Sequence, residues 1–230
     1  MSDHTLTPNR QLSGIQQAEN GTSERSTGLS LRYMKMSDIH PVVAIDRLVF
    51  DPPWSAESYA HEIKGSNYSH MVVLERYARM SAGWRRWLPG SWFRANGQTR
   101  FGRQIVGYGG LWHIADEAHI STIATDPRWR RQGYGEILLA VMIQRALTLK
   151  ASYVVLEVRA SNRAAQNLYR KYDFQTVDTK RNYYQNNRED AYDMRLYFDE
   201  TTVTQFNMRM ATLQTRYGFR DRFSTMNLAR

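Results

Sequence analysis

The chain has no cysteine among its 230 residues. This absence excludes disulfide bonds, metal sites with cysteine ligands and any acyl-cysteine intermediate. The chain also lacks an apolar run as long as a membrane span, and no charged-then-apolar leader opens it, so we expect a soluble cytoplasmic protein. We predict no metal site. The length indicates one domain with room for extensions and with enough residues to bury a substantial core.

Acidic residues are missing from one long stretch, residues 76–103. This stretch contains seven arginines and six aromatic residues, and it carries most of the formal net charge of +9. Arginine with interleaved aromatics suits ribosomal RNA, through phosphate contact and base stacking. Arginine with tryptophan also suits an anionic membrane surface. A third interpretation is a long loop that packs its own tryptophans on the edge of the domain and leaves its arginines in water. The pairs Pro89-Gly90 and Asn96-Gly97 are ordinary turn sequences and favour this interpretation.

A basic loop with glycines separates a predicted strand from a predicted helix. It reads T-D-P-R-W-R-R-Q-G-Y-G over residues 125–135 and fits the pattern R/Q-x-x-G-x-G/A. The first turn of a helix offers unpaired N–H groups and a positive dipole end, and glycines let a diphosphate approach that backbone. The loop therefore predicts an anion site, to which Arg128, Arg130 and Arg131 would add charge. The alternative is a plain strand-to-helix turn.

Four further motifs follow the loop in a characteristic order. They are L-E-V-R-A-S-N at 156–162, N-L-Y at 167–169, R-N-Y-Y at 181–184 and E-D-A at 189–191. In this order and spacing they resemble the GNAT acetyltransferases, and among them the RimI family of ribosomal-protein-alanine N-acetyltransferases. The resemblance runs from about Leu31 to Tyr197, apart from residues 76–103.

The resemblance implies an α/β protein with the GNAT fold, a mixed seven-stranded sheet flanked by helices. It also implies acetyl-CoA as co-substrate, held in a cleft where the fourth and fifth strands splay apart. Asn162 would contact this cofactor, cap the next helix, or do both. The pantetheine arm would pair with the fourth strand and the diphosphate would lie on the loop, which assigns to the cofactor Ile123, Ala124, Thr125, Arg130, Arg131, Gln132, Gly133, Tyr134 and Gly135.

Two residues match the catalytic positions of the RimI family. Glu157 lies in a strand-like segment, where a carboxylate is costly unless it is paired or useful. The resemblance makes it the general base, and an ion pair with an arginine is the alternative. The resemblance makes Tyr169 the acid that protonates the departing thiolate, a role that a phenol can fill. The alternative is an aromatic side chain that packs in the core.

The resemblance also implies the acceptor, a protein N-terminus that is most directly the alanine of a small-subunit ribosomal protein. Trp54, Tyr183 and Tyr184 match residues that wall the peptide site, although a packed tryptophan and two hairpin tyrosines are ordinary alternatives. An α-amine with a pKa near 8 is neutral far more often than lysine at pH 7, which suits a single base. Other N-termini, lysines or small amines stay open, as does a ribosome- or membrane-binding module that retains the fold.

The chain divides into three predicted parts. Residues 1–29 are polar and without periodicity, as in a disordered arm. Residues 30–198 form the GNAT domain, with 76–103 as an insertion. In 199–230, apolar residues recur every three or four positions from Val203 to Tyr217, with Gly218 next, so we expect an amphipathic helix docked on the domain or on a second copy. The oligomeric state stays open. Strands are expected at 31–35, 68–75, 104–113, 119–124, 153–159, 174–177 and 192–197, and other helices at 39–50, 56–64, from near 133 to 149, and 162–172.

Overall fold

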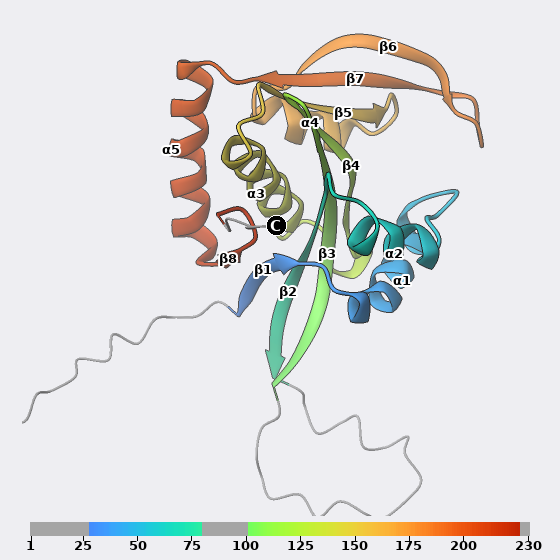
Figure 1. Cartoon of the computed structure of the whole chain (residues 1–230), viewed down its shortest axis with the longest axis vertical. Coiled ribbons are helices and arrows are strands. Elements are labelled where there is room, and N and C mark those ends of the chain that lie inside the picture. The colour runs from blue at the N-terminus through green and yellow to red at the C-terminus, as the bar shows by residue number, and fades with distance from the viewer. Residues whose placement is uncertain (1–27, 80–100, 226–230) are drawn as a thin grey trace, which may run out of the picture.

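The computed structural model describes residues 28–79 and 101–225. Its strands are β1 (Leu29–Tyr33), β2 (Ser69–Arg79), β3 (Phe101–Ile114), β4 (Glu117–Thr125), β5 (Tyr153–Arg159), β6 (Gln175–Tyr184), β7 (Glu189–Tyr197) and β8 (Arg220–Arg222). Its helices are α1 (Ile39–Val49), α2 (Ala56–Lys64), α3 (Tyr134–Thr148), α4 (Arg163–Lys171) and α5 (Glu200–Tyr217). Figure 1 shows α1 and α2 on one side of the central strands and α3 and α5 on the other.

The described strands form one sheet in the order β6-β7-β5-β4-β3-β2-β1-β8. The pairs β4–β5 and β1–β8 are parallel, and the other neighbours are antiparallel, so the sheet is mixed. Parallel neighbours need a crossover, which α3 supplies between β4 and β5. The end of β4, the basic loop and the first turn of α3 are therefore consecutive in the chain and adjacent to the β4–β5 junction.

A β-bulge changes the direction of the side chains along β4. The register with β3 skips Ser121. Before the bulge, Ala118 and Ile120 pack in the core that contains α3, whereas beyond it Ala124 packs in the second core, with α1 and α2. One extra residue exchanges the two faces because side chains alternate along a strand.

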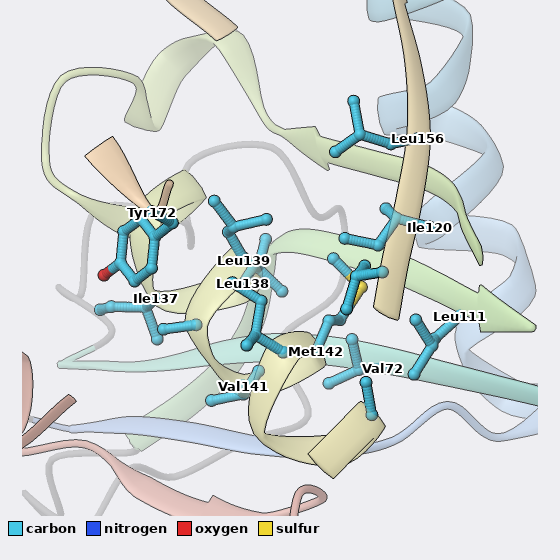
Figure 2. Close-up of a cluster of buried hydrophobic side chains, with 14 of the residues drawn as sticks. Val72, Leu111, Ile120, Ile137, Leu138, Leu139, Val141, Met142, Leu156 and Tyr172 are labelled. Carbon is cyan, nitrogen blue, oxygen red and sulfur yellow. The ribbon is translucent and has the colours of Figure 1, made fainter. Parts of the chain in front are cut away.

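The larger core surrounds α3. Every residue from Ile137 to Ile143 is buried, because the sheet covers one side of this helix and α5 the other. Figure 2 shows side chains of α3 meeting those of neighbouring strands. A Cβ on Gly109 of β3 would come within 2.7 Å of the Met142 sulfur, so this glycine lets α3 lie close to the sheet. Among the described residues, no helix is both long enough and apolar enough to cross a bilayer.

The segment after β7 belongs to the same folded body. In α5, Phe206 and Leu213 are buried in the core around α3, and Gly218 ends the helix with a left-handed φ of 56°. Arg209 of α5 forms an ion pair with Asp173, which follows α4 and has a left-handed φ of 64°. After the helix, β8 adds to the edge of the sheet beside β1.

The predicted α/β fold, the helix positions and the strand order along the chain are confirmed. The predicted number of strands is wrong, because seven were expected and β8 makes eight. The predicted ends of β2 and β3 are also too short, since these strands pair as far as Arg79 and Phe101, inside the expected insertion. The expected N-terminal arm and residues 80–100 of the insertion lie outside the described residues, so their predictions stay untested.

Candidate active site

The strands β4 and β5 separate partway along their length. Their parallel pairing joins Glu117–His119 to Tyr153–Val155 and goes no further, although β4 continues to Thr125 and β5 to Arg159. Because β3 pairs with β4 as far as Thr125, only the edge of β4 that faces β5 is left without a strand partner. Ile123, Ala124 and Thr125 lie on this free edge, which can take an extended arm as an added strand.

The basic loop joins the end of β4 to the amino end of α3, beside the split between β4 and β5 that forms the cleft of this site. Gly133 is the N-cap residue of this helix and has a left-handed φ of 80°. The first intrahelical bond of the turn runs from the Ile137 N–H to the Gly133 carbonyl, so the N–H groups of 134–136 are available to an anion. A Cβ on Gly135 would meet Thr125 Oγ1 at 3.6 Å and Leu168 at 3.9 Å, which is ordinary contact. These features fit the diphosphate of acetyl-CoA.

The three arginines of the loop differ in availability. Arg128 donates from Nε and Nη2 to the buried Asp126 carboxylate, and this pairing holds the pKa of Asp126 below its usual value. The expectation that Arg128 adds charge for a phosphate is therefore not supported by its position. Arg130, Arg131 and Gln132 are exposed, and Arg131 has a left-handed φ of 64°. Tyr134 is buried and anchors the first turn of α3 in the core.

Asn162 has a structural role that is visible in the geometry. Its side chain accepts a hydrogen bond from the Ala165 N–H at 3.1 Å, which caps the exposed amino end of α4. This cap fixes the start of the helix that carries Tyr169. Contact between Asn162 and a cofactor stays a prediction.

Glu157 lies at the start of the cleft, two residues beyond the last residue of β5 that pairs with β4. Its Oε2 lies 2.8 Å from Nε2 of His119, the last β4 residue paired with β5. Its Oε1 accepts a hydrogen bond from Lys180 of β6, and Lys180 also lies 3.6 Å from the Asp193 carboxylate of β7. The carboxylate is thus paired, as its place in a strand requires, but with histidine and lysine and not with an arginine.

These partners determine the ionisation of Glu157. The hydrogen bond from His119 is the largest influence, and with the Lys180 ammonium it outweighs the effect of burial and lowers the pKa of Glu157 to about 2. The side chain of Glu157 is only 12% exposed. Glu157 is therefore a carboxylate at neutral pH, and by itself it is a weak base.

Tyr169 lies on the inward face of α4 and is 5% exposed. Its ring is tilted against Phe174, with the ring centroids 5.9 Å apart. Burial, with a smaller contribution from Tyr184, raises the pKa of the Tyr169 phenol above its ordinary value. The phenol is therefore protonated at neutral pH, and the core contact and a role as proton donor are compatible.

A chain of aromatic rings connects the α1–α2 corner to His119. The Trp54 ring stacks with the Trp112 ring at a centroid distance of 6.5 Å, and Trp112 meets the His119 ring edge-on at 5.4 Å. Trp112 Nε1 donates to Glu62 of α2 at 2.8 Å. The Trp54 backbone is held by the buried Asp46 of α1, to which its N–H donates at 2.6 Å. Trp54 therefore lies on the same wall as His119.

The hairpin of β6 and β7 reaches the α1–α2 corner from the other side. The Arg159 guanidinium lies 3.8 Å from the centroid of the Tyr184 ring, and the Tyr183 ring packs edge-on against Tyr184 at 5.2 Å. Arg159 also donates to the Asp51 carbonyl at 3.4 Å, and Asn186 of the hairpin turn donates to the Asp51 carboxylate at 3.1 Å. These bonds bridge the hairpin and the corner that precedes Trp54.

The structure brings most of the predicted site residues to this cleft and adds others. His119, Lys180, Trp112 and Arg159 were not assigned a role from the sequence. His119 stands six residues before Thr125 at the start of the predicted fourth strand, so its position relative to Glu157 follows only from the register of two parallel strands. The cleft, the glycine turn and the paired carboxylate together are the arrangement expected of an acyltransferase that uses acetyl-CoA.

The sequence profile described as the Acetyltransferase (GNAT) family matches residues 52–174. The chain belongs to this family. It is an N-acetyltransferase, and acetyl-CoA is its co-substrate. The match ends before β6, so the β6–β7 hairpin and α5 lie beyond it.

Known proteins with a similar sequence or structure carry related names. The chain is 31% identical over 174 residues to a protein of Bacillus subtilis (strain 168) provisionally named ribosomal protein bS18-alanine N-acetyltransferase, covering 76% of this chain and 99% of that protein. The crystal structure of the ribosomal-protein-S18-alanine N-acetyltransferase from Escherichia coli superposes with a TM-score of 0.56 at 26% identity, covering 74% of this chain and 93% of that one. NAA60 of Arabidopsis thaliana in complex with acetyl-CoA has a TM-score of 0.56 at 16% identity, covering 74% and 98%, which shows the shared fold alone.

Proposed function

We propose that this chain transfers the acetyl group of acetyl-CoA to the α-amine of a protein N-terminus, and that its acceptor is the N-terminal alanine of a small-subunit ribosomal protein. The names of the similar Bacillus subtilis and Escherichia coli proteins support this acceptor. The observation that carries the proposal is the Glu157–His119 pair at the point where β4 leaves β5. It puts a group able to exchange protons beside the edge that suits the pantetheine arm.

Acetyl-CoA supplies the acetyl group as an activated thioester. The free edge of β4 at Ile123, Ala124 and Thr125 binds the arm, and a backbone N–H near Ala124 stabilises charge on the carbonyl oxygen. The loop of Arg130 to Gly135 holds the diphosphate. Since the full sequence contains no cysteine to carry the acetyl group, transfer to the amine is direct.

The acceptor amine loses a proton when it bonds to the acetyl carbon. A carboxylate whose pKa is lowered to about 2 is a poor acceptor for that proton. We assign the proton to the imidazole of His119, since imidazoles exchange protons near neutral pH. Glu157 then acts with His119, because its carboxylate orients the ring and stabilises the imidazolium.

Tyr169 completes the proton balance on the thiolate side. As the carbon–sulfur bond breaks, the thiolate takes the phenolic proton, and the phenolate is reprotonated from solvent after the products leave. Burial keeps Tyr169 protonated until that step.

The two aromatic walls suit the free end of a peptide. Trp54 and Trp112 lie on one side of the Glu157–His119 pair, and Tyr183 with Tyr184 lies on the hairpin whose Lys180 binds Glu157. The Asp51–Asn186 bond ties the two walls together. Two aromatic walls linked by this bond suit an amine at a chain terminus better than one in the middle of a folded surface.

The experiment compares three acceptors at equal concentration with purified protein and acetyl-CoA. The first is a peptide that begins with alanine. The second is the same peptide with its α-amine blocked and with an internal lysine. The third is spermidine. The proposal predicts product from the first acceptor alone, detected by mass spectrometry. Acetylation of the blocked peptide or of spermidine, without the first product, would favour the lysine or small-amine alternative.

The basic stretch 76–103 supports a second, non-catalytic candidate role at the ribosome or at an anionic membrane, based on its composition alone. Because β2 and β3 pair as far as Arg79 and Phe101, a short turn can replace residues 80–100 without disturbing the sheet. If the shortened protein loses binding to ribosomes or to anionic vesicles while the Glu157→Gln protein has no phenotype, the binding role is the main one.

A further inference from the structure

Tyr217, the last residue of α5, contacts the turn at Gly133 where we propose that the diphosphate of the cofactor binds. A Cβ on Gly133 would overlap the hydroxyl and the ring of Tyr217, so this phenol occupies the space beside the N-cap residue of α3. The sequence suggested that Gly133 makes room for a diphosphate. The structure shows that it also makes room for a side chain from α5, which lies outside residues 52–174.

A groove of about 540 Å³ lies close to this contact, between α3, α4 and α5. Its wall includes Glu136 from the first turn of α3, Lys171 from α4, and Arg209, Thr212 and Arg216 from α5. Arg216 immediately precedes Tyr217 in the chain. The groove therefore comes close to the turn proposed to hold the diphosphate.

Most charges of the groove are already paired. The Glu136 carboxylate accepts from Lys171 at 2.6 Å and from the Tyr172 hydroxyl at 3.1 Å, which reduces its repulsion of an anion near the helix end. Arg209 is held by Asp173. These two pairs leave the groove close to neutral before Arg216 is counted.

Among the described residues that line the groove, Arg216 is the cation without an ion pair. It forms no ion pair with any residue that the structure describes, and its guanidinium lies 5.2 Å from the centroid of the Tyr217 ring. A guanidinium stacked on an aromatic ring is oriented while its N–H groups stay free for a phosphate. The ring that orients Arg216 is the same ring that contacts Gly133.

We propose that α5 completes the coenzyme A site, with Arg216 as the residue that binds the 3′-phosphate on the ribose of the cofactor. Tyr217 couples the two halves of this site, because it packs on the diphosphate turn and supports the Arg216 guanidinium. The groove takes the nucleotide end of the cofactor beyond the diphosphate. This inference rests on the proposed seat of the diphosphate at the amino end of α3.

Calorimetric titration of the full chain with coenzyme A and with dephospho-coenzyme A, which lacks the 3′-phosphate, tests the proposal. Wild-type protein should bind coenzyme A roughly tenfold or more tightly than dephospho-coenzyme A, as for a charged hydrogen bond. Arg216→Gln should bind the two nucleotides equally. Arg222→Gln is the matched control, since it removes one exposed positive charge from the same C-terminal segment, on β8, and it should keep the wild-type preference.

The outcomes separate this inference from the proposed function. Equal wild-type affinities for the two nucleotides, or a full preference retained by Arg216→Gln, would overturn the role of Arg216 and leave the diphosphate seat intact. Loss of preference in Arg222→Gln as well would also overturn it, because the effect would then come from net charge. If folded wild-type protein binds neither nucleotide, the diphosphate seat fails and this proposal fails with it.

Discussion

The Glu157 carboxylate lies 2.8 Å from the His119 imidazole, across the last parallel pairing of β4 and β5. The two side chains come from strands that diverge immediately afterwards, so the pair lies at the inner end of the cleft. Lys180 holds the other carboxylate oxygen. In this arrangement two partners fix the carboxylate, and the imidazole is the side chain beside it that we propose takes the proton of the acceptor amine.

Replacing His119 should therefore slow the chemical step. We expect His119→Ala to lower kcat by roughly 10²–10⁴-fold, the usual range for the loss of a general base. Affinity for coenzyme A should stay within about twofold of wild type, because His119 lies away from the diphosphate turn. Steady-state kinetics together with calorimetry measure both quantities. An unchanged kcat would return the role of base to Glu157 or to solvent.

Glu157 should also contribute to stability in a defined pH window. Its pKa is about 2 in the folded protein and near 4.5 ordinarily, so the contribution is fully present above pH 4.5. It is lost as the pH falls from 4.5 towards 2, and its size is on the order of 2 kcal/mol. The difference in melting temperature between wild type and Glu157→Gln, measured from pH 7 to pH 3, should shrink as the pH falls below 4.5. Parallel curves throughout would show that the His119 and Lys180 contacts do not stabilise the ionised form.

Tyr169→Phe removes one hydroxyl and keeps the buried ring. If the phenol protonates the thiolate, kcat should fall by roughly 10²-fold while the melting temperature changes little. Because burial raises the pKa of Tyr169, wild-type kcat should show no loss from ionisation of this phenol up to pH 10. A pH profile of both proteins tests the two points. Wild-type activity in the Phe variant would leave Tyr169 as a core residue only.

Two glycines of the same turn provide a matched comparison. A Cβ on Gly133 would overlap Tyr217 and would occupy a left-handed φ of 80°. Gly133→Ala should therefore destabilise the fold by about 1–3 kcal/mol and weaken coenzyme A binding. Gly135→Ala places its methyl group at ordinary contact distances, so its stability should stay close to that of wild type. Equal effects of the two substitutions, measured by urea denaturation, would contradict this account of the turn.

Local signals predicted much of the fold. The apolar period from Val203 to Tyr217 and the terminating Gly218 predicted α5, and Ser55 caps α2 by accepting from the Ser58 N–H at 3.1 Å. Glycine spacing predicted the turn before α3. In contrast, β8 is three residues long and reads R-D-R, so it has no apolar pattern and is a strand only because β1 lies beside it.

The parts of the site that the sequence did not predict depend on long-range register. His119 and Lys180 reach Glu157 because β4, β6 and β7 align with β5 in one particular register. The sequence predicts that Arg128 adds charge for a phosphate, whereas its guanidinium pairs with Asp126 two residues earlier, a contact that depends on the geometry of the turn. The contact of Tyr217 with Gly133 required the docking of α5. Residue types and their spacing in the sequence do not predict these long-range contacts.

The location of the transferred acetyl group tests the central claim most directly. A peptide that begins with alanine and carries one internal lysine is incubated with acetyl-CoA and wild-type protein, and fragment-ion mass spectrometry then locates the acetyl group. The account predicts acetyl on the alanine α-amine in wild type and its loss in His119→Ala. Acetyl on the lysine side chain, or an equal yield in the two proteins, would contradict it.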